Sequence, residues 1–223
     1  HLRADTRARY NGFSLVDLLV SIAVITVLIG LLLPSISAVR EAARKVVCAS
    51  NVRQHGLGIA MYAADYGGFL PYSKFGNPDR SVNYQPQLMT ILHTDEFPEV
   101  WDGLGVLFVQ EYLEAPGVFY CPSHRNGQVL PVYARNWETR QGRIEGNYQF
   151  RGGIGQRLDR VADGQALVTD ALRSQSDFNH QIGANVLRAD FAVGWFADLD
   201  RQFSSSLPFS TMDADAAWKV TDA

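Results

Sequence analysis

The stretch GFSLVDLLVSIAVITVLIGLLLPSISAVREAARK, residues 12–45, decides the fold. From Phe13 to Leu33 it holds 21 residues with a single charged side chain, Asp17. A helix of that length spans roughly 31 Å at about 1.5 Å per residue, which matches the hydrocarbon core of a bilayer. We therefore predict a membrane-spanning helix. A carboxylate inside such a helix is unfavourable without a partner, so Asp17 is a candidate functional residue.

The residues around this run predict its orientation. Arg3, Arg7 and Arg9 precede it, and positively charged flanks stay in the cytoplasm. Residues beyond about 40 should therefore lie outside the cytoplasm, although the basic residues within 40–45 weaken the asymmetry. A secretory signal peptide fits less well, because its apolar core is roughly 7–15 residues long and ends at a small-residue cleavage site.

The sequence NGFSLVDLLVSIAVITVLIGLLLP, residues 11–34, resembles the N-terminal segment of type IV pilins and type II secretion pseudopilins. The resemblance implies that a prepilin peptidase cuts after Gly12 and methylates the amine of Phe13. Asp17 is then the fifth residue after the cut, where the family usually has Glu, and Pro34 is the twenty-second, where it often has Pro. In assembly, Asp17 would pair with the Phe13 amine of the same or a neighbouring subunit and set the axial register.

This resemblance implies a structural subunit of an extracytoplasmic helical filament, either a type IV pilus or a type II secretion pseudopilus. The expected partners are further copies of the chain, the prepilin peptidase and the inner-membrane assembly machinery. The chain would lie in the inner membrane before assembly, with its C-terminal domain outside the cytoplasm, and in an extracellular or periplasmic filament afterwards. The alternative is a membrane-anchored binding module that does not polymerise.

The helix should continue well past the membrane, to residue 66. Apolar and small residues recur every three or four positions from Val39 to Tyr66, and Gly67 with Gly68 should end the helix. His55 is expected at a surface or interface. The other face carries polar residues, namely Arg40, Glu41, Arg44, Lys45, Asn51, Arg53 and Gln54.

Pro34 lies inside the predicted helix and removes one backbone N–H, and Gly30 weakens the same turn. Assembled pilins often have a stretched, non-helical segment before this proline. We therefore expect a kink or a melted stretch between about Thr26 and Pro34, with a mild bend as the alternative.

A second resemblance concerns the rest of the chain. Residues 48–72 and 118–124 resemble segments of a bacterial pseudopilin-like group that has a C-terminal pattern of His, nine residues, then Asp-Gly. Here His180 is followed after nine residues by Asp190, but Phe191 replaces the glycine. We expect His180 and Asp190 to face each other across a hairpin and to fix its register. A catalytic pair is the weaker alternative.

The fold class predicted is α+β and pilin-like, with one long N-terminal helix packed on a small antiparallel sheet. The expected parts are a basic leader at 1–12, a helix at 13–66 with its outer half beginning at 34, and a globular domain at 67–223. Within this domain we predict a short helix at 102–113, strands at 146–152, 165–171 and 183–198, and a loop-rich tail in which Trp218 docks.

The sequence contains little that points to catalysis. No phosphate loop, nucleophile elbow or zinc-protease motif is present, and the net charge of −3 predicts no nucleic-acid partner. We therefore predict neither enzyme activity nor a cofactor. Calcium remains an alternative because acidic residues gather at 198–215, although without calcium-loop spacing. Cys48 and Cys121 form either a disulfide or two separate thiols.

Overall fold

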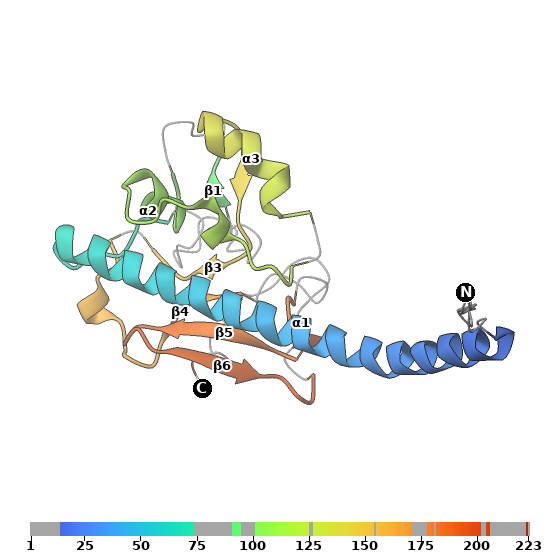
Figure 1. The fold of residues 1–223 in the computed structure, drawn as a ribbon. Helices are drawn as coiled ribbons and strands as arrows, with labels where there is room; N and C mark the ends of the chain where they lie inside the picture. Colours follow the sequence, from blue (N-terminus) through green and yellow to red (C-terminus); the bar gives the residue numbers. More distant parts are fainter. Residues whose placement is uncertain are drawn as a thin grey trace, which may run out of the picture. The chain divides into compact units, whose positions relative to one another are not determined.

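A computed structural model describes residues 14–73, 91–94, 101–124, 127–153, 155–170, 178–180, 182–201, 204–205 and 222. Two compact units are present, His1–Ala42 and Ala43–Ala223. The expected leader at 1–12 lies outside the described residues, as does Trp218 in the tail. The predicted α+β layout is confirmed, because one long helix packs against small antiparallel sheets in the manner of a pilin (Figure 1).

The long helix α1 runs from Leu15 to Asp65 and has 51 residues. Both ends agree with the prediction within two residues. Gly67 and Gly68 follow it with φ of 61° and 86°, the left-handed region that glycine enters without strain. The Gly68 N–H donates to the carbonyl oxygen of Ala63 at 2.7 Å, which satisfies one of the last open carbonyls. The glycine pair therefore ends the helix by the mechanism that the sequence predicts.

The helix is α-helical through Pro34, so a melted stretch between Thr26 and Pro34 is wrong for this structure. One proline removes one backbone hydrogen bond, and the turns on both sides retain theirs. Side chains support these turns: Thr26 Oγ1 donates to the Ile22 carbonyl oxygen and Ser37 Oγ donates to that of Pro34, each at 2.7 Å. The interruption at Pro34 is thus confined to a single missing donor.

The main sheet has four antiparallel strands in the order β3-β4-β5-β6. The strands are β3 Gln149–Phe150, β4 Ala166–Thr169, β5 Gly183–Arg188 and β6 Val193–Ala197. All four fall inside the predicted strand segments. A turn at residues 189–192 joins β5 to β6, in agreement with the predicted hairpin.

A second layer is built from short elements that the sequence reveals only in part. The predicted helix at 102–113 appears as the shorter α2, Gly105–Val109. The elements that were not predicted are β1 Ile91–His93, β2 Ile144–Glu145 and α3 Leu130–Thr139; η2 Pro116–Phe119 and η3 Leu158–Arg160 are short 3-10 turns. Strands β1 and β2 pair with each other, apart from the main sheet.

The part of α1 that belongs to the second unit, residues 43–65, lies between these two layers (Figure 1). A Cβ placed on Gly56 would lie 2.8 Å from Leu187 of β5, and one placed on Gly58 would lie 3.2 Å from Leu113, just after α2. Two glycines on different sides of the helix thus allow close approach of a layer on each side. Arg53 and Gln54, predicted for the polar face, remain exposed.

The predicted apolar stripe is therefore correct only in its second half. Val52, Gly56, Ile59 and Ala63 are buried as expected. Val46, however, is 68% exposed and is not part of the buried core. Two residues expected at the surface are inside instead: Asn51 is 7% exposed and His55 is fully buried.

Candidate functional site

The carboxylate of Asp17 caps the N-terminus of α1. The Ser14 N–H donates to Asp17 Oδ2, and the Val16 N–H donates to Ser14 Oγ, both at 3.3 Å. This reciprocal pair is a capping box, which satisfies amide groups that no helix carbonyl can reach. Gly12 and Phe13 lie outside the described residues. Asp17 therefore caps its own helix in this chain, and its pairing with a processed amine remains a prediction.

The surface of α1 between Leu15 and Leu33 is apolar and open. Its large apolar side chains range from 50% exposed at Ile29 to 79% at Leu15. A soluble monomer rarely exposes an apolar patch of more than a few hundred Å². Among the described residues α1 is the one helix whose length and composition would allow it to cross a membrane. A surface of this kind needs a cover of lipid or of protein.

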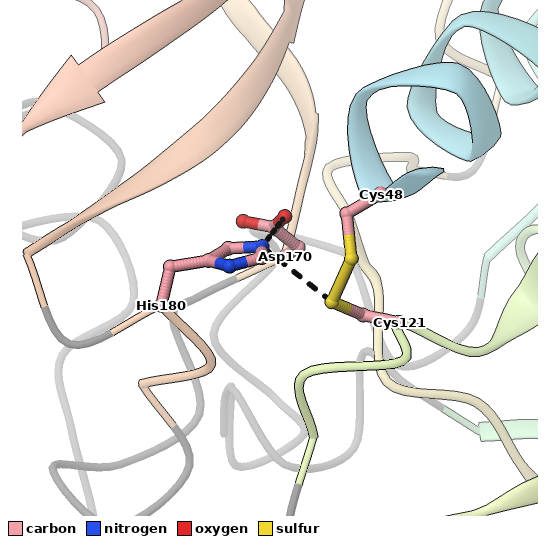
Figure 2. Close-up of side chains that lie close together, drawn as sticks. All are labelled: Cys48, Cys121, Asp170 and His180. Atoms are coloured by element: carbon pink, nitrogen blue, oxygen red, sulfur yellow. Dashed lines mark hydrogen bonds and ion pairs between the residues drawn. A yellow bond between two sulfur atoms is a disulfide. The ribbon is translucent and has the colours of Figure 1, made fainter. Parts of the chain in front are cut away.

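A buried cluster of four side chains lies in the second unit, where α1 meets the sheet. Cys48 of α1 forms a disulfide with Cys121, which follows η2. His180 Nε2 lies 3.5 Å from Cys121 Sγ and 3.1 Å from Asp170 Oδ2. Figure 2 shows that one ring nitrogen of His180 faces both the sulfur and the carboxylate. All four residues are buried, and their sulfur, nitrogen and oxygen atoms lie within 4.8 Å of one another.

The backbone of the sheet holds Asp170 in place. Asp170 directly follows β4, and Asn185 lies opposite it on β5. The Asn185 backbone N–H donates to Asp170 Oδ1, and Asn185 Nδ2 donates to Oδ2, both at 2.8 Å. Asn179 donates from its amide group to the Asp170 carbonyl oxygen. The carboxylate thus has a fixed orientation before His180 is considered.

A lysine contacts the same tryptophan that His180 packs against. The His180 ring packs edge-on against Trp195 of β6, with centroids 5.7 Å apart. Lys45 Nζ lies 3.0 Å from the centre of the Trp195 ring, a cation–π contact. Partial burial lowers the pKa of Lys45, and the negative charge of Asp170 opposes that shift. A positive charge therefore lies near the buried carboxylate.

The expected pairing of His180 with Asp190 is wrong. His180 precedes β5 and Asp190 follows it, so the full length of the strand separates them. The partner of His180 is Asp170. Asp190 instead forms the β5–β6 turn: its Oδ1 accepts from the Ala192 N–H at 2.9 Å.

Phe191, which follows Asp190 in the β5–β6 turn, has a φ of 63°, in the left-handed region that glycine occupies most easily. The Phe191 ring packs against the core, and a Cβ placed on Gly56 would lie 3.6 Å from it. Phe191 therefore strains the backbone of the turn, while its ring adds packing against the core.

His55 is the second buried histidine, and it has a structural role. Its Nε2 lies 3.1 Å from the Val118 carbonyl oxygen, and its ring packs against Phe119 and Tyr148. Nδ1 has no hydrogen-bond partner. Burial lowers the pKa of His55 to about 3, with the hydrogen bond to Val118 as a smaller, opposing cause. The ring is neutral at physiological pH.

The acidic residues considered for calcium do not form a site within the described part of the chain. Asp198 is buried and accepts from the Ser204 N–H at 2.8 Å, while Asp200 is exposed. Asp213 and Asp215 lie outside the described residues. The one described group of His, Cys, Asp and Glu side chains close enough to share a metal is the Cys48, Cys121, Asp170 and His180 cluster.

Sequence reasoning missed Asp170 altogether. The available signal was an acidic residue directly after the apolar run ALV and Thr169, at the end of a buried strand. Its partner could not be read from the sequence, because His180 is brought to it by the antiparallel pairing of β4 with β5.

The comparison with protein families gives one match. The family described as "Protein of unknown function (DUF1559)" matches residues 37–173, more than half of the chain, so the protein belongs to that family. No curated protein and no solved structure matches the chain. The matched range includes Cys48, Cys121 and Asp170 but ends before His180.

Proposed function

We propose that the protein is a structural subunit of an extracytoplasmic helical filament, processed after Gly12 by a prepilin peptidase. The observation that carries the proposal is the apolar surface of α1 from Leu15 to Leu33, which is exposed on all sides and has the capping carboxylate of Asp17 near its start. The family match and the pilin-like spacing of Gly12, Asp17 and Pro34 support it. The role is structural, and catalysis is no part of it.

In this proposal the apolar part of α1 contacts lipid before assembly and other subunits afterwards. Before assembly it lies in the inner membrane, and the globular unit lies outside the cytoplasm. In the filament, the same surface packs against the helices of further copies, without closure into a ring. Assembly machinery in the inner membrane transfers the subunit from one environment to the other.

Asp17 has two successive roles in this scheme. In the uncut chain it accepts from the Ser14 N–H at 3.3 Å. Cleavage would leave Phe13 with a charged N-terminal amine, and a spacing of four residues is one that places two positions on the same face of a helix. A buried positive amine is unfavourable without a partner, and the carboxylate is the nearest candidate within its own chain.

A set of three variants separates charge from capping. Asp17→Asn keeps the shape but loses the charge, Asp17→Glu keeps the charge, and Ser14→Ala removes half of the capping box. We measure the share of subunit in filaments sheared from cells that carry the peptidase and assembly machinery, relative to the share in the membrane. Asp17→Asn should lower this ratio about tenfold or more, which corresponds to a loss of at least about 1.4 kcal/mol in the free energy of assembly. Asp17→Glu and Ser14→Ala should stay near the wild-type ratio.

The outcome also tests the alternative of a non-polymerising anchored module. If the wild-type chain stays in the membrane fraction and no filament forms in the presence of the complete machinery, the filament proposal is wrong. Equal filament yield from Asp17→Asn and wild type would leave the filament in place and remove the role of Asp17.

A further inference from the structure

Two buried ionisable side chains, Asp170 and His180, lie beside the Cys48–Cys121 disulfide, although a disulfide does not require them. A disulfide is neutral, and a buried apolar site would hold it equally well. Here a carboxylate that is fully buried and an imidazole that is 4% exposed are placed beside it. Burying ionisable groups is unfavourable unless hydrogen bonds or a bound ion compensate for it. The set Cys, Cys, His, Asp consists of good ligands for a zinc-class ion.

The geometry points to a redox-dependent metal site: we propose that, once the disulfide is reduced, Cys48 Sγ, Cys121 Sγ, His180 Nε2 and Asp170 Oδ2 bind one divalent zinc-class ion. This inference is independent of filament formation. All four ligand atoms lie within 4.8 Å of one another in the oxidised chain.

Two of the distances already agree with tetrahedral coordination. Zinc at about 2.3 Å from sulfur and about 2.0 Å from nitrogen or oxygen places sulfur roughly 3.5 Å from nitrogen, and nitrogen roughly 3.3 Å from oxygen. Cys121 Sγ is 3.5 Å from His180 Nε2, and that nitrogen is 3.1 Å from Asp170 Oδ2. Reduction frees the two sulfurs to separate to the roughly 3.8 Å that such a site requires.

The surroundings suit the bound state as well. Asn185 holds the Asp170 carboxylate through two hydrogen bonds of 2.8 Å, which leaves Oδ2 directed at His180. Such outer contacts orient ligands in metal sites. Two thiolates and one carboxylate exceed the charge of a divalent ion by one, and Lys45, on the neighbouring Trp195 ring, lies near enough to Asp170 to offset it.

The chemistry balances with a phosphine as reductant. The phosphine takes oxygen from water and becomes its oxide, and the two protons and two electrons convert the disulfide into two thiols. The metal ion then displaces the two thiol protons, which leave to solvent. His180 binds as neutral imidazole, and its contact to Asp170 Oδ2 is replaced by contacts of both atoms to the metal.

The test uses the full chain in detergent, oxidised or reduced with a phosphine, under anaerobic conditions. Cobalt(II) is titrated as a spectroscopic probe, and zinc then displaces it. We expect one cobalt per reduced chain, with thiolate charge-transfer and tetrahedral bands, and none for the oxidised chain. Asp170→Asn should weaken cobalt binding about tenfold or more, and the matched control Asp190→Asn, in the β5–β6 turn, should not change it.

Stability gives a second readout. Zinc should raise the melting temperature of the reduced chain and leave that of the oxidised chain unchanged. If reduction unfolds the metal-free chain, zinc added before the phosphine should keep it folded and stay bound. Three results would overturn the proposal. The oxidised chain, or a Cys48→Ala/Cys121→Ala variant, could bind cobalt as tightly as the reduced wild-type chain. Alternatively, neither redox state of the wild type could bind cobalt.

Discussion

Apolar residues in the two halves of α1 meet opposite environments. In the first half Ile29 is 50% exposed, whereas in the second half Val52 and Ile59 are fully buried by their own domain. Gly30 has no atom within 4 Å of an added Cβ, whereas Gly56 has Leu187 at 2.8 Å. Apolar side chains on a helix must be buried, but their sequence does not show whether the same chain, another copy or lipid buries them.

The largest expected effect comes from cutting the link that fixes the second half to its domain. Cys48→Ala/Cys121→Ala opens a loop with a sequence separation of 73 residues. The loss of chain constraint should lower the free energy of unfolding by roughly 4 kcal/mol. Urea unfolding of the full chain in detergent and with a chelator, followed by tryptophan fluorescence, measures it. A change below about 1 kcal/mol would mean that packing alone holds the helix there.

A matched pair of glycine substitutions compares the halves directly. Gly56→Ala places a methyl group against Leu187 and should lower the free energy of unfolding by about 1–3 kcal/mol. Gly30→Ala meets open space and should strengthen its own helix by up to about 1 kcal/mol. Urea unfolding reports the first change, and amide hydrogen exchange over residues 26–34 reports the second. Equal destabilisation at both positions would contradict the contrast between the halves.

The smallest effect concerns pH, and it comes from His55 in the buried half. The pKa of His55 falls from 6.5 to about 3 on folding, so the unfolded chain binds a proton that the folded chain does not. This contribution is complete above pH 6.5 and is lost as pH falls toward 3. It predicts a loss of about 1 kcal/mol between pH 7 and pH 5.5. Urea midpoints at each pH measure it, and His55→Gln should flatten the slope; an unchanged slope would exclude His55 as its source.

Much of the fold was predictable because its signals are local. The bounds of α1 follow from an apolar run that begins at Phe13 in the sequence and from the left-handed Gly67 and Gly68. The β5–β6 hairpin follows from two strand-forming runs and the turn around Asp190. The two-stranded β1–β2 sheet was not predicted, since its strands of three and two residues have no period to detect. Strand β3 is as short, but it lies inside the glycine-bounded run 146–152, which predicts a strand.

The buried cluster was only half predictable. The cysteines could be named as a pair, and His180 was singled out, but its partner was not Asp190. The link to Asp170 depends on the register of β4 against β5, which no local pattern encodes. The burial of His55 was missed for a related reason, since a one-sided helix was assumed and two layers cover it.

Filament formation by the first half of α1 begins with cleavage of the Gly12–Phe13 bond. Mass spectrometry of the N-terminal peptide from sheared, polymerised protein shows whether this bond is cut. We expect a peptide that starts at Phe13 and carries a methyl group on its amine. An intact Gly12–Phe13 bond in the polymerised protein would contradict it.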